Sequence, residues 1–405
     1  MVKYLLKLKS AVLLLTFLFV FTNCDDDETE NTTPSVTKAA VIENYAELVY
    51  ANYVDTYNLA ATLKQKIETF LANPTAETLA DAKQAWLDSR EPYGQTEAFR
   101  FYDGPIDDEN GPEGQLNAWP LDESYIDYVS GNVNGADGNI NVNIIGDAET
   151  FPTIDKDLIA AQNEDGGETN ISAGYHAIEF LLWGQDLSEG AGGGDRPYTD
   201  YVTTDECTNG NCDRRGDYLL AATELLIDDL QILLDAWEPG AAYRTTFTSE
   251  DELENSLEKI LIGIGKLSKG ELAGERMFVA WDEKSKEDEH SCFSDNTHRD
   301  IVNNAKGIVN VYTGTYVWTD GTVVEGPGID ELVEQEDETL NTEMMELLNS
   351  AFTATEAIQA PFDQEFLAEP GRTRIKSAID LLRSQGDKIA EISALFGFTL
   401  DPSDV

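Results

Sequence analysis

Apolar residues recur every three or four positions along much of this chain, which is the spacing of one buried face of an α-helix. The longest such face predicts a helix over 42–70, through Ile42, Tyr45, Val49, Tyr53, Tyr57, Ala60, Leu63, Ile67 and Phe70. The residues Asn73-Pro74-Thr75 then predict a stop and a new start. A second helix is expected from Ala76 towards Phe101, with a kink or restart at Pro92.

The later part of the chain repeats this pattern after two loop-rich stretches, 103–169 and 189–195. Ser249 and Glu252 have the spacing of a capping box before one of the later helices. Alternation typical of strands is scarce, with 139–145 and 313–324 as the two candidates. Helices are expected over 174–183 (ending at Gly184), 219–237, 253–267, 298–312, 329–358 and 375–392.

Four long helices therefore precede Pro239-Gly240 and four follow it. Helices joined in this way bury their apolar faces against one another in bundles. We expect an all-α protein with two four-helix-bundle-like domains, residues 38–240 and 241–405, and with long irregular loops.

The first residues have the pattern of an export signal. Lys3, Lys7 and Lys9 precede an apolar run over 11–21 that is too short to span a bilayer as a mature helix. Cys24 follows directly, at the position where a bacterial lipoprotein is cleaved and acylated. Residues 1–23 are thus predicted to be a lipoprotein signal peptide and residues 24–37, which are acidic and Thr-rich, a flexible tether. An ordinary secreted protein is the alternative.

The formal net charge is −50, from 77 acidic and 27 basic residues. Binding nucleic acid requires Lys and Arg to neutralise phosphates, so nucleic acid is excluded as a partner. A field of this sign draws cations towards the surface, although an acidic surface can also serve solubility alone. After the signal, no apolar run approaches the length of a membrane span. Acyl chains on Cys24 would then hold the protein to an outer-membrane lipid surface, on its periplasmic or exposed side.

The remaining cysteines suggest an oxidised compartment. Cys207 and Cys212 bracket a short polar loop, and the cell envelope favours a disulfide between them. A zinc pair is the alternative, but no other Cys or His lies near them in sequence. Cys292 is left unpaired.

Histidine is the informative residue, because the chain has only three. His176 and Glu179 are one helical turn apart, so an imidazole and a carboxylate lie on the same face, and Trp183 continues that stripe. Asp295 and His298 have the same spacing. A neutral imidazole beside a carboxylate can ligate iron, zinc or manganese. The alternative is that His176 forms a hydrogen bond inside the bundle and Glu179 pairs with an arginine.

The helix over 76–101 carries a second clue. Arg90, Tyr93 and Glu97 continue the stripe of Trp86, so the face turned towards the interior is partly charged. Buried charges need partners, which predicts a polar network there. Glu97 is either a third metal ligand or the ion-pair partner of Arg90 or Arg100.

Several segments together resemble the imelysin-like family. They are Gly174-x-His176-x-x-Glu179 with Phe180-Leu181-Leu182-Trp183-Gly184, Trp86-x-x-x-Arg90-x-x-Tyr93, Gln95 to Phe101, and Trp119-Pro120-Leu121-Asp122. Gly274-Glu275-Arg276-Met277 and the run from His290 to Asp300 are similar to the branch called iron-regulated protein A. The resemblance covers about residues 38–398. It implies two helical domains about a pseudo-twofold, with a site between them, in a cell-envelope protein of iron acquisition or regulation.

Three functions are compatible with this resemblance. The first is binding of iron, as an ion or a chelate such as haem, at His176 and Glu179 with Glu97, Asp295, His298 or His290, and with transfer to an iron transporter. The second is a zinc metallopeptidase, since the family is catalogued as metallopeptidases. The motif His-Glu-x-x-His is absent, so such an enzyme would need His290 or His298 as the third ligand and Glu97 as the base. The third is a partner-binding scaffold with a vestigial site.

Overall fold

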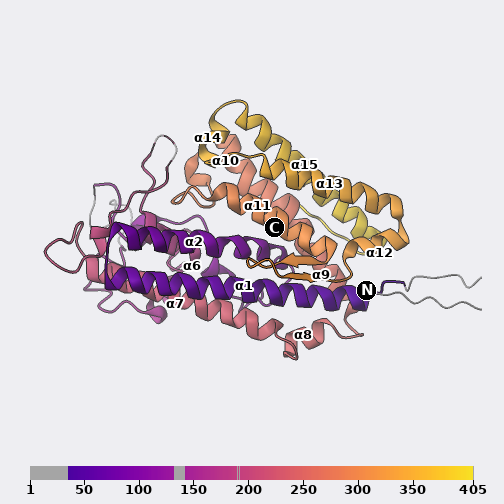
Figure 1. Ribbon diagram of the computed structural model, residues 1–405, viewed down its shortest axis with the longest axis horizontal. Coiled ribbons are helices and arrows are strands. Elements are labelled where there is room, and N and C mark those ends of the chain that lie inside the picture. Colours follow the sequence, from indigo (N-terminus) through magenta and orange to yellow (C-terminus); the bar gives the residue numbers. More distant parts are fainter. Residues whose placement is uncertain (1–34, 132–141, 189, 191, 405) are drawn as a thin grey trace, which may run out of the picture. The chain divides into compact units, whose positions relative to one another are not determined.

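Two long helices, α1 (Lys38–Ala72) and α2 (Ala76–Thr96), lie side by side and are joined by a short turn (Figure 1). Their starts follow from local chemistry, because Thr37 and Thr75 each accept a hydrogen bond from a backbone N–H of the first turn. Pro92 lies inside α2 and does not break it, contrary to the expected restart. The helix instead ends at Thr96 and continues as a short 3-10 turn, η1 (Glu97–Phe99).

The computed structural model describes residues 35–131, 142–188, 190 and 192–404. The predicted signal peptide, Cys24 and most of the tether lie outside these residues. In the part of the chain that is described, none of the helices is sufficiently long and apolar to cross a bilayer.

The first group of helices consists of α1, α2, α6 (Gly174–Trp183) and α7 (Cys212–Trp237). α1 packs against α2 and α7, while α6 packs against α2 and α7. A disulfide between Cys207 and Cys212 lies at the start of α7. The connections contain the short elements α3 (Glu113–Leu116), α4 (Glu123–Ile126), α5 (Lys156–Gln162), η2 (Tyr198–Tyr201) and α8 (Ala242–Phe247).

The second group is built around a long helical segment that changes its winding. α9 (Leu253–Lys266) passes into a π-helix, η3 (Leu267–Phe278), and then into α10 (Val279–Glu283). α15 packs along α9 and η3, α13 along α15, and α11 against α13 and η3. The bounds of these elements and their neighbours are α11 (Thr297–Thr313), α12 (Ile329–Glu336), α13 (Glu338–Glu356), α14 (Phe362–Leu367), α15 (Gly371–Leu395) and η4 (Lys286–Asp288).

The two groups meet where α2 packs along α11 (Figure 1). Glycines permit this close approach, since a Cβ at Gly307 would lie 2.4 Å from the carbonyl oxygen of Gln95. The residues Val36–Val405 form one compact unit. The all-α class is confirmed, while the division into domains near Gly240 stays a prediction.

Three local predictions need correction or limits. Ser249 and Glu252 form no capping box, because α9 begins at Leu253 without a side-chain cap. The helix expected over 329–358 is two helices, since Asp337 ends α12 and caps α13. The 313–324 candidate does form strands, since β1 (Thr315–Val317) and β2 (Val323–Glu325) pair as an antiparallel hairpin over nearly its whole length. Of the 139–145 candidate, only 142–145 is described, and it is not a strand.

Candidate functional site: two carboxylate-bound histidines

His176 and Glu179 lie on one face of α6, as their spacing predicted, and bond to each other. His176 Nδ1 is 2.9 Å from Glu179 Oε2. Both side chains are buried, at 1% and 0% exposure. The second oxygen of Glu179, Oε1, accepts hydrogen bonds from the backbone N–H (2.8 Å) and hydroxyl (2.6 Å) of Ser294. Glu179 therefore orients the imidazole, and both of its oxygens are engaged.

The position of α6 depends on the glycines at its ends. Gly174 has φ +80°, and a Cβ there would lie 2.5 Å from the carbonyl oxygen of Leu116. Gly184 ends the helix at φ +74°. Only glycine adopts such angles without strain. All residues of α6 are buried, so this helix forms the interior wall from which His176 projects.

A second histidine–carboxylate pair comes from the other half of the chain. His290 Nδ1 is 2.9 Å from Asp300 Oδ2, which also accepts the hydroxyl hydrogen of Ser291. Asp300 Oδ1 accepts from Arg90 Nε (3.3 Å) and Nη2 (3.1 Å). Asp300 thus joins α11 to α2 through a buried ion pair.

The two imidazole rings face each other edge to face. Their centroids are 4.6 Å apart and their planes are inclined by 79°. His176 Nε2 is buried and has no hydrogen-bond partner. His290 Nε2 has one long contact, 3.4 Å, with Asn117 Nδ2. Each histidine therefore has one nitrogen fixed by a carboxylate and the other weakly bound or unbound.

A cluster of arginines and glutamates adjoins the rings. Asn117 accepts from Arg90 Nη1 (2.6 Å) and donates to Glu97 Oε1 (3.0 Å). Glu97 Oε2 accepts from Arg100 Nη1 (2.6 Å) and from Arg276 Nη2 (2.8 Å). Of the two roles expected for Glu97, the structure has it as an ion-pair partner of Arg100. Tyr93 contributes a ring below Arg90, 5.2 Å from the guanidinium carbon.

Burial determines the charge of the two histidines. It lowers the pKa of His176 to about 3, and the positive charge of Arg90 acts in the same direction. Burial also lowers the pKa of His290 to about 3, with Arg276 as the next cause. Both imidazoles are therefore neutral at pH 7, which is the form that ligates metals.

The two carboxylates differ in charge because their neighbours differ. Burial raises the pKa of Glu179 to about 8, although Ser294 donates to it, so at pH 7 this carboxyl is mostly protonated and donates to His176 Nδ1. Ligation of a metal through His176 Nε2 would therefore release one proton from this pair. Burial would also raise the pKa of Asp300, but Arg90 and His290 hold that pKa well below its usual range. An ionised Asp300 requires His290 Nδ1 to carry the hydrogen, which leaves a lone pair on His290 Nε2.

The two imidazoles are the groups of this site that suit a metal ion. Ligating histidines commonly donate their other ring N–H to a carboxylate, as His290 does to Asp300. The unpartnered Nε2 of His176 also needs an explanation, since buried polar atoms are rarely left without a bond. In the described residues, however, no three His, Cys, Asp or Glu side chains are placed to hold one ion. Further ligands would have to come with the ion or from a rearrangement of the chain.

Other residues predicted for the site lie apart from this pair of rings. Asp295 accepts from the backbone N–H of Gly192, and among the described residues the hydrogen bond of the His298 ring runs from Nδ1 to the carbonyl oxygen of Asp295, at 3.2 Å. No described contact joins either side chain to His176. Trp183 packs on Trp86, with ring centroids 5.4 Å apart, and lines a separate cavity.

Sequence reasoning overlooked Asp300, Asn117 and Ser294 as members of the network. Asp300 and Asn304 are four residues apart on α11 and border its apolar stripe, so their spacing was a usable signal. Asn117 and Ser294 lie in irregular segments, where no periodicity indicates which side chains point inward.

Comparisons with known proteins agree on one family. Residues 49–389 match the family model described as imelysin. The chain is 24% identical over 346 residues to iron-regulated protein A of Synechococcus elongatus. The aligned region covers 85% of this chain and 82% of that protein.

Two crystal structures share the fold. A protein described as an iron-regulated protein A precursor, from Parabacteroides distasonis, has a TM-score of 0.68 at 19% identity and covers 90% of this chain and 97% of its own. An imelysin-like protein from Psychrobacter arcticum has a TM-score of 0.59 at 12% identity and covers 91% and 99%. At these identities the likeness supports the fold alone.

Proposed function

This chain belongs to the imelysin family, as its motifs predicted, and we propose that it binds iron, or a ligand containing iron, through His176 and His290. Iron is the proposed metal because the Synechococcus relative is named an iron-regulated protein. Imidazole nitrogens suit iron and zinc alike, so zinc is the alternative ion.

The unbonded Nε2 of His176, beside the ring of His290, carries this proposal. Each ring has its Nδ1 held at 2.9 Å by a carboxylate, which fixes the direction in which Nε2 points. The sequence predicted Glu179 as a metal ligand. In the proposed site Glu179 instead orients the ring of His176, which is the ligand. His290, which the sequence also offered as a ligand, and Asp300, which it did not, are the proposed contribution of the second half in place of Asp295 and His298.

Two protein ligands leave most coordination positions of an iron ion open. A chelate, or an ion that keeps part of its water shell, fills those positions without a complete protein cage. Both histidines are buried, so entry of either requires the two helical groups to separate locally along α2 and α11. Arg90 and Arg276, which contact both groups, would hold the site closed through Asp300 and Glu97.

Peptidase activity at the same residues finds less support. A zinc hydrolase needs a general base whose pKa lies near the working pH. Burial would raise the pKa of Glu97, but Arg276 and Arg100 lower it to about 2, which makes Glu97 a weak base. Both histidines are also closed to a peptide substrate in this conformation.

The cellular location of the protein is also part of the proposal. The signal over 1–23 and the cysteine at position 24 support a lipid-anchored envelope protein. A net charge of −50 would raise the local concentration of cations there. An iron transporter in the same envelope is the proposed recipient of the ligand.

Anaerobic calorimetry with Fe(II) tests the proposal. The parent protein should bind saturably, and His176→Asn should abolish this binding, because an asparagine amide can still form a hydrogen bond with Glu179 but lacks Nε2. Glu179→Gln should weaken binding by roughly 10–100-fold, as the loss of a residue that orients a ligand commonly does.

His298→Asn separates the two ligand sets. The proposal predicts that this variant binds like the parent, because the hydrogen bond of His298 in the described residues goes to Asp295 and not to the proposed pair. Loss of binding in His298→Asn with full binding in His176→Asn would contradict the proposed pair. Absence of saturable Fe(II) and Zn(II) binding in the parent would leave the scaffold function in its place.

A further inference from the structure

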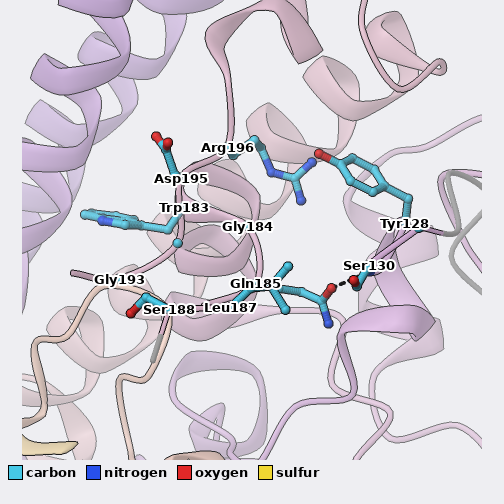
Figure 2. A pocket seen from close by; sticks show the side chains of 12 residues that line it. Tyr128, Ser130, Trp183, Gly184, Gln185, Leu187, Ser188, Gly193, Asp195 and Arg196 are labelled. Atoms are coloured by element: carbon cyan, nitrogen blue, oxygen red, sulfur yellow. Dashed lines mark hydrogen bonds between the residues drawn. The ribbon is translucent and has the colours of Figure 1, made fainter. Parts of the chain in front are cut away.

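A second polar site lies at the C-terminal end of α6, outside the histidine network. A cavity of about 350 Å³ lies there, and its lining side chains are drawn in Figure 2. Its wall includes the Tyr128 ring, Gln185, Leu187 and the guanidinium of Arg196. This volume is in the range of pockets that take small ligands.

Arg196 is held in one orientation on several sides. Its Nη1 donates to Asp127 Oδ2 (2.7 Å) and to Asp200 Oδ2 (3.3 Å). The guanidinium carbon lies 4.9 Å from the centre of the Tyr128 ring and 5.2 Å from that of Phe180. In Figure 2 the guanidinium extends from the chain towards Tyr128. Arg196 is thus a preorganised side chain and only 4% exposed.

The edge of this guanidinium that carries Nε makes no hydrogen bond through that atom. Arg196 Nε is buried and has no hydrogen-bond partner. Both side-chain hydrogen bonds of Arg196 within the described residues leave from Nη1. Nε and a terminal nitrogen form the fork that binds a carboxylate through two parallel hydrogen bonds. Arg196 lines the cavity, so a ligand there that reached this buried edge would satisfy the unpaired donor.

We propose that this cavity binds an organic carboxylate that carries a compact apolar group, with the Nε edge of Arg196 on the carboxylate. The apolar group of the ligand would pack against Leu187 at the rim of the cavity. This large aliphatic side chain is 64% exposed, and the ligand would cover it. Both a free small acid and the C-terminal residue of a peptide have this chemistry. The proposal does not depend on metal binding at His176.

Arg196 is the cationic side chain among the residues that line this cavity, and Asp195, which also lines it, opposes an anion. Asp127 is already shared with Arg215, whose Nε and Nη2 lie 2.6 and 3.0 Å from its two oxygens. Asp127 and Asp200 therefore face two arginines, and the set of four is neutral. The acidic surface repels anions at long range, but salt screens that repulsion beyond about 10 Å at 0.1 M ionic strength.

Calorimetry of the protein with N-acetyl-leucine tests the proposal. Saturable binding is expected, and N-acetyl-leucinamide, which has the same shape without the charge, should bind roughly tenfold more weakly or worse. A blocked tripeptide with a free C-terminal leucine distinguishes the sources. Tighter binding of the tripeptide indicates a peptide C-terminus, and equal or weaker binding indicates a small acid.

Variants locate the site. Arg196→Lys keeps the charge beside Asp127 and Asp200 but loses Nε, and it should weaken binding at least tenfold. Leu187→Glu places a negative charge at the rim and should weaken binding several-fold, whereas the matched surface change Ile232→Glu on α7 should not. Because Leu187 and Ile232 are exposed, both variants should unfold at nearly the temperature of the parent.

Three results would overturn the proposal. One is equal affinity for the acid and the amide. Another is unchanged affinity in Leu187→Glu. The third is the absence of saturable binding of both N-acetyl-leucine and the tripeptide to the parent protein.

Discussion

Single residues in the histidine network depend on one another for their charge. Arg90 and Asp300 are each 1% exposed, and isolated charges at such positions would be expensive. The sequence predicted that Arg90 and Glu97 need partners, and it predicted the contact of His176 with Glu179 from their spacing. It could not identify Asp300 as the partner of Arg90, because 210 residues separate them and only tertiary packing brings them together.

Removal of one member of the Arg90–Asp300 pair should therefore be costly. Asp300→Asn leaves the guanidinium of Arg90 without its counter-charge and should lower the free energy of unfolding by about 3–5 kcal/mol. Glu254→Gln breaks the exposed pair of Lys38 and Glu254 and should cost less than about 1 kcal/mol. Chemical denaturation of both variants measures the difference. Equal losses would contradict the buried network.

Asp229 gives a prediction of pH dependence away from the site. Its carboxyl is buried on α7, and burial, followed by the charge of Asp228, raises its pKa to about 7. The folded state thus holds a proton that the unfolded chain releases near pH 4. This carboxyl has no destabilising effect below that pH, and its effect grows as the pH rises from 4 to 7 and is complete above 7.

Asp229→Asn should remove this effect. We expect the variant to be about 1–3 kcal/mol more stable than the parent at pH 8 and equally stable near pH 4, by denaturation at each pH. Asp235→Asn, at an exposed position of the same helix, is the matched control. A gain for Asp229→Asn that is independent of pH would show that the titration has been misassigned.

At the scale of elements, periodicity predicted the long helices well and their interruptions poorly. The faces over 42–70, 174–183 and 219–237 all lie in helices, because burial of an apolar stripe requires the 3.6-residue period. The π-helix η3, which packs against α15 and α11, was not predicted, because an apolar stripe does not distinguish its wider winding from that of an α-helix. The break at Asp337 was also missed, because the apolar stripe continues on both sides of it.

Asp337 provides the test at this scale. Its side chain accepts a hydrogen bond from the backbone N–H of Leu340 (3.0 Å) and so starts α13. Asp337→Ala should cost about 0.5–2 kcal/mol of stability, and Asp337→Asn should cost almost nothing, because asparagine caps equally well. Thermal or chemical unfolding distinguishes them. A continuous helix through this position would make the alanine variant neutral or stabilising.

At the scale of the whole molecule, the candidate site exists because α2 and α11 pack together. His176 and His290 belong to helical groups that the chain builds separately, yet their rings are 4.6 Å apart. The resemblance to a family implied a site between two halves. Residue spacing alone favoured Asp295 and His298 as ligands from the second group of helices. Spacing cannot show which side of a segment faces the first group of helices.

The predicted anchor concerns the whole molecule as well. Cys24→Ala should remove palmitate labelling and release the protein from the membrane fraction of a Gram-negative host, because acylation of that thiol is its proposed attachment. Cys292→Ala, which changes the free thiol, should stay in the membrane fraction. Membrane association that survives Cys24→Ala would require another mode of attachment.

Anomalous diffraction at the iron absorption edge, from crystals of protein loaded anaerobically with Fe(II), tests whether the two histidines bind iron. One strong peak is expected within coordinating distance of Nε2 of both His176 and His290, and it should be lost in His176→Asn. A peak at Asp295 and His298 or only on surface carboxylates, or no peak in loaded crystals, would contradict it.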